Sequence, residues 1–310
     1  MTKFIARRLL MMAGTMLVVS VLTFLLLEVN GENVAVKVLG PYSTDEQRDL
    51  WLARNGYDEP AAWRYFEWLG GMMTGDFGQS VKYRAPVSEV MLPRLANTGL
   101  LALVVFSIMV PMSIIAGVLA GMREGGLLDR AISVFAIVTT SVPEFASAVL
   151  LAFIFVILLG WLPATSAMQE GFDPLQLVLP ASVLILFGFG YVARMMRAAM
   201  ADVMQSNYVR TAILKGMPYR RVILRHAVRN ALIAPFTIII LQINWLLSGV
   251  IVVEFFFAYR GFGALLLEAS LTQDIHLLQA CAMVSVVVAV STQTIADIGY
   301  GFLNPQVRFT

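Results

Sequence analysis

Four polar residues interrupt long apolar stretches of this 310-residue sequence. Glu144 follows Pro143 in one stretch, Gln242 and Asn244 share a second, and Asp297 lies in the last. Polar groups are costly in an apolar environment, so such residues often line a path for ions or solutes. The competing interpretation is hydrogen bonding between packed helices, which is slightly favoured for Gln242 and Asn244. For Glu144 and Asp297 the pattern does not separate path lining from a helix-end or packing role.

Common nucleotide-binding and catalytic motifs are absent from the sequence. A P-loop needs a lysine followed by Ser or Thr, because the lysine reaches the phosphates and the hydroxyl binds Mg²⁺. The four lysines are followed instead by Phe, Val, Tyr and Gly. Neither a His-Glu-x-x-His zinc motif nor a Gly-x-Ser-x-Gly nucleophile elbow occurs. The sequence therefore predicts no nucleotide site, metal site or enzyme active site in this chain.

Four further residues with reactive side chains have simpler interpretations. Asp274 and His276 are two positions apart and could exchange protons, but without a third partner we expect a solvated loop. His226 lies in a basic segment and is expected to serve an interaction or packing role. Cys281, the sole cysteine, cannot form an intrachain disulfide and is expected to be a small packing residue.

Composition determines the kind of element that must hold these residues. Hydrophobic residues make up 59% of the chain and charged residues 14%, against about 45–50% and about 25% in a soluble domain. Too little polar surface remains to cover a water-exposed core, and a net charge of +2 gives no argument for nucleic acid. The sequence therefore predicts an integral membrane protein.

The apolar stretches are long enough for about six membrane-spanning helices. A bilayer core of about 30 Å needs about 20 apolar residues, and helices are required because lipid cannot satisfy backbone hydrogen bonds. Pro143 can break the third stretch, and Pro180 weakens the fourth. We therefore expect an all-α fold. The predicted spans are Leu9–Leu27, Thr98–Met122, Ala131–Leu159, Leu175–Ala193, Ala231–Val253 and Leu278–Phe302.

Basic residues predict the orientation of these spans. Lys3, Arg7 and Arg8 precede the first span, which favours a cytoplasmic N-terminus. Six spans then place residues 194–229 and the C-terminus inside as well. The 194–229 segment contains eight basic residues and one acid, whereas residues 160–174 contain no Lys or Arg.

Residues 28–94 are expected outside, since long loops cross a membrane largely regardless of charge. Within them, Trp63–Met73 is predicted to form a short amphipathic helix at the interface. Leu9–Leu27 is longer than a signal-peptide apolar core and no clear cleavage site follows, so we expect a retained helix.

The basic segment Asn207–Pro235 predicts a helical hairpin. Gly216 suits the end of one helix and Pro218 the first turn of the next. Val209 and Ala212 belong to an apolar stripe at helical spacing. Such a basic amphipathic hairpin can lie on anionic lipid or insert into a groove of a partner, and the pattern alone favours neither.

The run from Tyr208 to Gly216 resembles the coupling loop of ATP-binding-cassette (ABC) importer permeases. It has the form typical of the dipeptide, oligopeptide and nickel branch, in which Arg replaces the Glu of the general pattern. Arg225-His226-Ala227 and Arg229-Asn230-Ala231 match the continuation. The resemblance implies that the ATPase-coupling residues are Tyr208, Arg210, Thr211, Ala212, Lys215, Gly216, Arg225 and His226.

The resemblance extends over nearly the whole chain. Further matching motifs, in the same order as in the family, are Gly75–Ser80, Ser141–Phe145, Gly160–Ala164, Val253-Glu254, Gly261–Gly263 and Asn304–Arg308. Asn30–Asn33 and Arg260 depart from the family pattern, which has Pro-Gly-Asp-Pro and Pro at these places. Both departures bear on binding-protein docking or solute choice.

The family implies a type I ABC-importer permease fold with both termini cytoplasmic. Residues 1–95 would contain the first span and the extracytoplasmic segment, and residues 96–310 five spans and coupling loop 199–230. This chain would line half of a path and pair with a second, homologous permease as a heterodimer. Two ATPase subunits holding ATP and Mg²⁺ and an external solute-binding protein would complete the complex, so this chain would be no enzyme and hold no cofactor.

The resemblance places the protein in a bacterial or archaeal cytoplasmic membrane, in contact with lipid. Peptide is the favoured solute, and nickel chelates, opines, glutathione-like compounds and oligosaccharides stay open. An ATP-independent secondary transporter or channel is the alternative, with Glu144 or Asp297 as an ion site. It would predict internal repeats, and none is visible.

Overall fold

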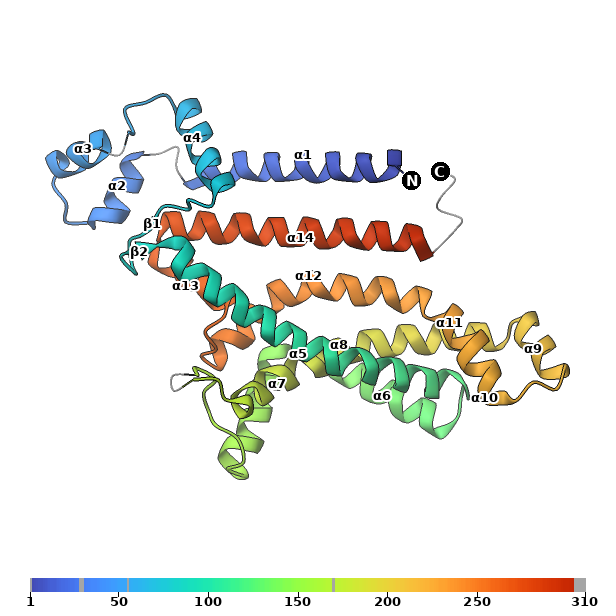
Figure 1. Cartoon of the computed structure of the whole chain (residues 1–310). Helices are drawn as coiled ribbons and strands as arrows, with labels where there is room; N and C mark the ends of the chain where they lie inside the picture. The colour runs from blue at the N-terminus through green and yellow to red at the C-terminus, as the bar shows by residue number, and fades with distance from the viewer. Residues whose placement is uncertain (1, 28–30, 55, 169–170, 304–310) are drawn as a thin grey trace. The chain divides into compact units, whose positions relative to one another are not determined.

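The computed structural model describes the chain except for residues 1, 28–30, 55, 169–170 and 304–310 (Figure 1). The described residues form helices joined by loops, with one pair of two-residue strands. They divide into two compact units, Met1–Thr98 with Arg260–Thr294 and Gly99–Tyr259 with Ile295–Thr310. The helical class predicted from the sequence is confirmed, with the strand pair as a small addition.

Candidate membrane spans number four to six among the described residues. Four single helices are long and apolar enough, at Ile5–Leu27, Val87–Gly121, Pro174–Met204 and Ile275–Gly299. Two bent pairs can each form one more span, namely Leu127–Ser141 with Glu144–Leu158 and Tyr219–Ala231 with Ile233–Ile243. This range includes the six spans predicted from the sequence.

The third predicted span is broken at its proline. Helix α6 (Leu127–Ser141) ends before Pro143, and α7 (Glu144–Ala152) with the π-helix η1 (Phe153–Leu158) continues after a bend of 102°. Proline has no N–H to donate, and its ring clashes with the preceding helical turn. Pro143 lies at the N-cap of α7, so the break is at the residue where the sequence predicted it.

The unit of Met1–Thr98 and Arg260–Thr294 has its core around Leu265, Leu277 and Cys281. Cys281 is buried, as predicted. The strands pair antiparallel, with Ser80 opposite Ala85. Its elements are α1 (Thr2–Leu27), α2 (Gly31–Leu39), α3 (Asp45–Arg54), α4 (Ala61–Thr74), β1 (Gln79–Ser80), β2 (Ala85–Pro86), the start of α5 (Val87–Gly121), α13 (Phe262–Thr272) and most of α14 (Ile275–Leu303).

Helix α4 contains the predicted amphipathic segment Trp63–Met73. The helix ends at Gly75, whose φ of 86° is the left-handed conformation common after a helix. On its α1 side, the Tyr65 hydroxyl and the Ser20 hydroxyl lie 2.8 Å apart in a hydrogen bond. The predicted helix is confirmed.

The unit of Gly99–Tyr259 and Ile295–Thr310 is built around α8 (Pro174–Met204), which packs against α6, α7 and α12 (Ile233–Phe256). Helix α8 continues through Pro180, although the proline was expected to weaken it. A Cβ at Gly190 would lie 2.4 Å from the Ala136 carbonyl oxygen, so only glycine permits this approach of α8 to α6. The remaining elements are α9 (Asn207–Leu214), α10 (Tyr219–Arg221), η2 (Val222–Ala227) and α11 (Val228–Ala231).

Candidate functional site

The hairpin of residues 206–231 turns at the predicted Gly216. Its φ is 74°, in the left-handed region that favours glycine. The Gly216 N–H donates to the Ile213 carbonyl at 2.9 Å, and the Met217 N–H donates to the Ala212 carbonyl at 3.3 Å. This pair of bonds is a Schellman motif, which closes the C-terminus of a helix. Pro218 is the N-cap of α10, one position before the first turn in which it was predicted.

One face of the hairpin packs against the end of α8. The buried residues are Val209 and Ala212 of α9, Val222, Ile223 and Ala227 of η2, Ala231 of α11, and Met196 and Met200 of α8. The opposite face carries the exposed side chains of Tyr208, Arg210, Thr211, Lys215 and Arg225. His226 is half-buried, and Ala212 alone among the eight predicted coupling residues is buried. The hairpin therefore exposes a basic face, while its apolar face packs against α8.

A hydrogen bond closes the base of the hairpin. The Asn230 side-chain amide donates to the Tyr208 hydroxyl at 2.9 Å and to the His226 carbonyl at 3.1 Å. The first of these bonds joins α9 to α11, at opposite ends of the hairpin. The exposed basic face is therefore held in one shape by both the turn and the base.

An ion pair braces the helices from which the hairpin extends. The Arg197 guanidinium of α8 donates to both carboxylate oxygens of Asp129 in α6, at 2.9 and 2.8 Å. Asp129 is only 3% exposed and also accepts from the Gly125 N–H at 2.8 Å. Arg197 further pairs with Glu124 at 3.3 Å. Two parallel bonds from a guanidinium fix orientation as well as distance.

The approach of α5 to α8 reinforces this brace. A Cβ at Gly117 would lie 2.5 Å from the Cβ of Met196, and one at Gly121 would lie 2.6 Å from the Arg197 carbonyl oxygen. The two helix backbones are thus in direct contact near the hairpin. Sequence reasoning missed both the brace and this contact, and a stripe of small residues four apart was the only available signal.

The four polar residues of the apolar stretches lie on three different helices. Glu144 is half-buried in the first turn of α7, directly after the break at Pro143. Gln242 is 7% exposed, and its amide donates to the Gly188 carbonyl at 3.4 Å, which supports the packing interpretation. Asp297 is half-buried in α14. The side chain of Asn244 lies outside the described residues, so path lining stays a prediction for these positions.

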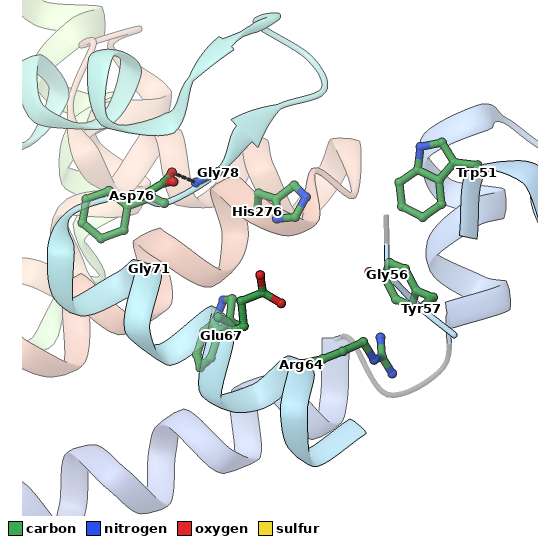
Figure 2. Close-up of a pocket in the computed structure, with 11 residues that line it drawn as sticks. Trp51, Gly56, Tyr57, Arg64, Glu67, Gly71, Asp76, Gly78 and His276 are labelled. Carbon is green, nitrogen blue, oxygen red and sulfur yellow. Dashed lines mark hydrogen bonds between the residues drawn. The ribbon is translucent and has the colours of Figure 1, made fainter. Parts of the chain in front are cut away.

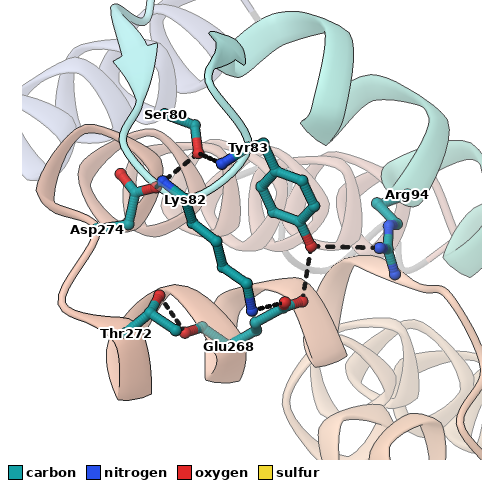
Figure 3. Close-up of polar contacts among 7 residues, drawn as sticks. All are labelled: Ser80, Lys82, Tyr83, Arg94, Glu268, Thr272 and Asp274. Carbon is teal, nitrogen blue, oxygen red and sulfur yellow. Dashed lines mark hydrogen bonds and ion pairs between the residues drawn. The ribbon is translucent and has the colours of Figure 1, made fainter.

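Asp274 corrects the expectation of a solvated loop. It is 1% exposed and accepts from the Ser80 hydroxyl at 2.6 Å and from the Lys82 N–H at 3.1 Å (Figure 3). It also begins α14, since its backbone carbonyl accepts from the Leu278 N–H at 2.8 Å. The donors lie more than 190 residues earlier in the chain, where local sequence gives no sign of them.

A second carboxylate in the same unit holds the loop between the strands. Glu268 of α13, a helix too short to be a span, pairs with the Lys82 ammonium and accepts from the Tyr83 hydroxyl at 2.8 Å (Figure 3). Burial by itself raises the pKa of Glu268, but the hydrogen bonds from Lys82 and Tyr83 outweigh it, so the pKa is lowered. Burial and the same bond raise the pKa of Tyr83. The β1–β2 loop is thus attached to α13 and α14 by charge-assisted bonds.

Known families and relatives match along the whole chain. The family described as binding-protein-dependent transport system inner membrane component matches residues 109–309, and its N-terminal counterpart matches residues 1–102. A putative peptide transport system permease protein of Brucella abortus is 34% identical over the full length of both chains. The oligopeptide transport system permease protein AppB of Bacillus subtilis is 32% identical, and the glutathione transport system permease protein GsiC of Escherichia coli 31%, again over both full lengths.

These matches agree with the motifs, the apolar helices and the basic hairpin, and they favour no ATP-independent mechanism. ABC permease subunits are not enzymes themselves, because ATP hydrolysis lies in partner subunits. The chain belongs to the family of inner-membrane components of binding-protein-dependent transport systems and is a multi-pass permease subunit of an ABC importer.

Proposed function

We propose that this chain lines half of the translocation path of a peptide importer and pairs with a second, homologous permease. The names of the full-length relatives, which include peptide, oligopeptide and glutathione permeases, support a peptide-like solute. Two ATPase subunits with ATP and Mg²⁺ bind on the cytoplasmic side, and a solute-binding protein delivers the peptide from outside. Nickel chelates, opines and oligosaccharides are the other solutes to test.

The proposed topology has six spans and two cytoplasmic termini. The bent pair of α6 with α7 and η1 is the third span and α12 is the fifth, so that residues 206–231 stay in the hairpin. The clustering of basic residues in 194–229 supports a cytoplasmic hairpin. Residues 31–94 then lie on the external side. The same arrangement applies in a bacterial or an archaeal cytoplasmic membrane.

The observation that carries the coupling role is the exposed basic face of a hairpin fixed to α8. Arg210 and Lys215 are exposed and would form charge-assisted bonds with an acidic cleft of an ATPase. Closure of the ATPase pair would displace the hairpin, and the Asp129–Arg197 ion pair would carry that displacement into α6 and α8. Rigid-body tilting of these helices would switch the path between its two openings.

The test is ATP-driven uptake of a labelled tripeptide into vesicles that contain the complete importer. Arg210→Glu combined with Lys215→Glu should lower uptake at least about tenfold, because a charge-assisted bond contributes about 1.5–3 kcal/mol. Arg54→Glu, an exposed charge reversal in α3, is the matched control and should leave uptake unchanged. Uptake by vesicles that lack the ATPase subunits would contradict the proposal.

A further inference from the structure

A pocket of about 350 Å³ lies in the unit of Met1–Thr98 and Arg260–Thr294 (Figure 2). Its walls come from α3, the loop that follows α3, α4, the Asp76–Gly78 loop and the first turn of α14. Its volume falls within the range of roughly 300–1,000 Å³ that is typical of small-molecule sites. The sequence analysis gave no sign of it, because its walls come from segments far apart in the chain.

Opposite charges line this pocket from a single helix face. Arg64 and Glu67 are three residues apart on α4, so their Cβ atoms are roughly 5–6 Å apart. The Arg64 guanidinium lies 4.4 Å from the centre of the Tyr57 ring, which holds it by a cation–π contact. Within the described residues, no hydrogen bond or ion pair holds the Glu67 side chain. The pocket thus presents a fixed cation beside an available carboxylate.

Aromatic and polar groups form the rest of the wall. Figure 2 shows Trp51 and Tyr57 on one side and the His276 ring above the Glu67 carboxylate. Gly78 borders the pocket beside His276, and a Cβ there would lie 3.3 Å from the imidazole ring. The described residues contain no group of three or more His, Cys, Asp or Glu side chains that could hold a metal ion.

We propose that this pocket binds the two charged termini of a dipeptide. Arg64 receives the carboxylate, Glu67 receives the ammonium group, and Trp51 covers the apolar part of the ligand. The termini of an extended dipeptide are about 7 Å apart, which suits charges that project from positions i and i+3 of one helix. The inference rests on the proposed peptide transport and adds a site on the permease itself.

Equilibrium binding to the importer complex, purified without its solute-binding protein, tests this site. The probes are dialanine and N-acetyl-dialanine, which differ in the ammonium group that Glu67 is proposed to bind. Glu67→Gln should weaken dialanine binding about tenfold and leave the weaker N-acetyl-dialanine binding unchanged. Glu67 is exposed, so the variant should fold, and thermal unfolding checks this. Glu46→Gln on α3 is the matched control and should change neither affinity.

The outcomes separate the site from the transport function. Equal weakening of both peptides, or of neither, overturns the assignment of the ammonium to Glu67. Absence of dialanine binding to the wild-type complex overturns the site, and if the complete importer still takes up dialanine, the proposed function stands. Failure of uptake for every peptide overturns the proposed solute class and the site with it. If the pocket binds a partner protein instead of a peptide, Glu67→Gln should weaken complex assembly and leave dialanine binding unchanged, which would overturn the proposal.

Discussion

At residue 216 the backbone adopts a conformation that glycine tolerates and other residues avoid. The φ of 74° permits the two bonds that end α9, and apart from Gly216 and its chain neighbours no heavy atom lies within 4 Å of the position that a Cβ would take. Strain from a side chain at this position would therefore come from the backbone alone. A substitution at Gly216 can therefore change the turn of the hairpin without disturbing the packing of the hairpin on α8.

Gly216→Val should abolish most uptake while it leaves the fold intact. A left-handed conformation costs an L-residue roughly 1–2 kcal/mol and is strongly unfavourable for a β-branched one, so the turn should open. Gly40→Val is the matched control, because Gly40 has a φ of 94° and the same open surroundings outside the hairpin. Vesicle uptake and thermal unfolding measure the two effects. Normal uptake by an assembled Gly216→Val complex would contradict the proposed mechanism, in which displacement of the hairpin moves α6 and α8.

Glu268 makes stability depend on pH in the acid range. Its pKa in the fold lies below the ordinary 4.5, so its contribution is present above about pH 4.5 and is lost as the pH falls through the folded value. The melting temperature of the wild-type chain should therefore fall more steeply below that pH than the melting temperature of Glu268→Gln. Glu89→Gln, an exposed change in the same unit, should keep the wild-type slope. Parallel slopes for the wild type and Glu268→Gln would contradict the assignment.

At the scale of elements, α5, α6 and α8 are joined by the Asp129–Arg197 ion pair and by backbone contact at Gly117 and Gly121. The hairpin packs against α8 through Met196 and Met200. A displacement of the hairpin should therefore move α8, and with it α5 and α6, as one packed body. This arrangement suits a lever, because packed interfaces shift between discrete arrangements and deform little.

Asp129→Asn should destabilise the chain by about 2 kcal/mol, since it removes charge-assisted bonds from a carboxyl group buried beside a guanidinium. We expect uptake to fall while ATP hydrolysis continues, because the hairpin can still dock but no longer moves the helices as one body. Asp45→Asn is the control, since Asp45 pairs with Arg48 at 3.2 Å but is 94% exposed and should contribute little. Denaturation, ATPase and uptake assays together measure the effect. Equal losses of stability in Asp129→Asn and Asp45→Asn would contradict the prediction that the buried ion pair contributes more than the exposed one.

Local signals predicted much of this structure. The turn at Gly216, the helix around Trp63–Met73 and the break at Pro143 depend on residue type and helical period, which a short window contains. The buried role of Asp274 and the Asp129–Arg197 pair could not be predicted in this way, because the paired residues are 194 and 68 positions apart. An isolated acid in a loop has the same local sequence whether it is solvated or buried. Only the tertiary fold decides between the two.

At the scale of the whole molecule, the proposed topology separates Tyr42 from Leu214 across the membrane. Tyr42 is 99% exposed in the segment between α2 and α3, and Leu214 is 80% exposed at the end of α9. Cys281 is the sole cysteine of the sequence, so Cys281→Ser gives a background without a native thiol. In intact cells a membrane-impermeant maleimide should label Tyr42→Cys and spare Leu214→Cys until the cells are lysed. Labelling of both in intact cells would contradict six spans with cytoplasmic termini.

The hydrogen bond between Ser80 and Asp274 also has a consequence for biosynthesis. A ribosome that adds about 5–20 residues per second needs roughly 10–40 s to make the 194 residues between these partners. In the proposed topology, the strand pair would reach the external side during that time without the carboxylate that holds its loop. The nascent segment would therefore stay accessible to quality-control proteases and chaperones until Asp274 and α14 have been synthesised.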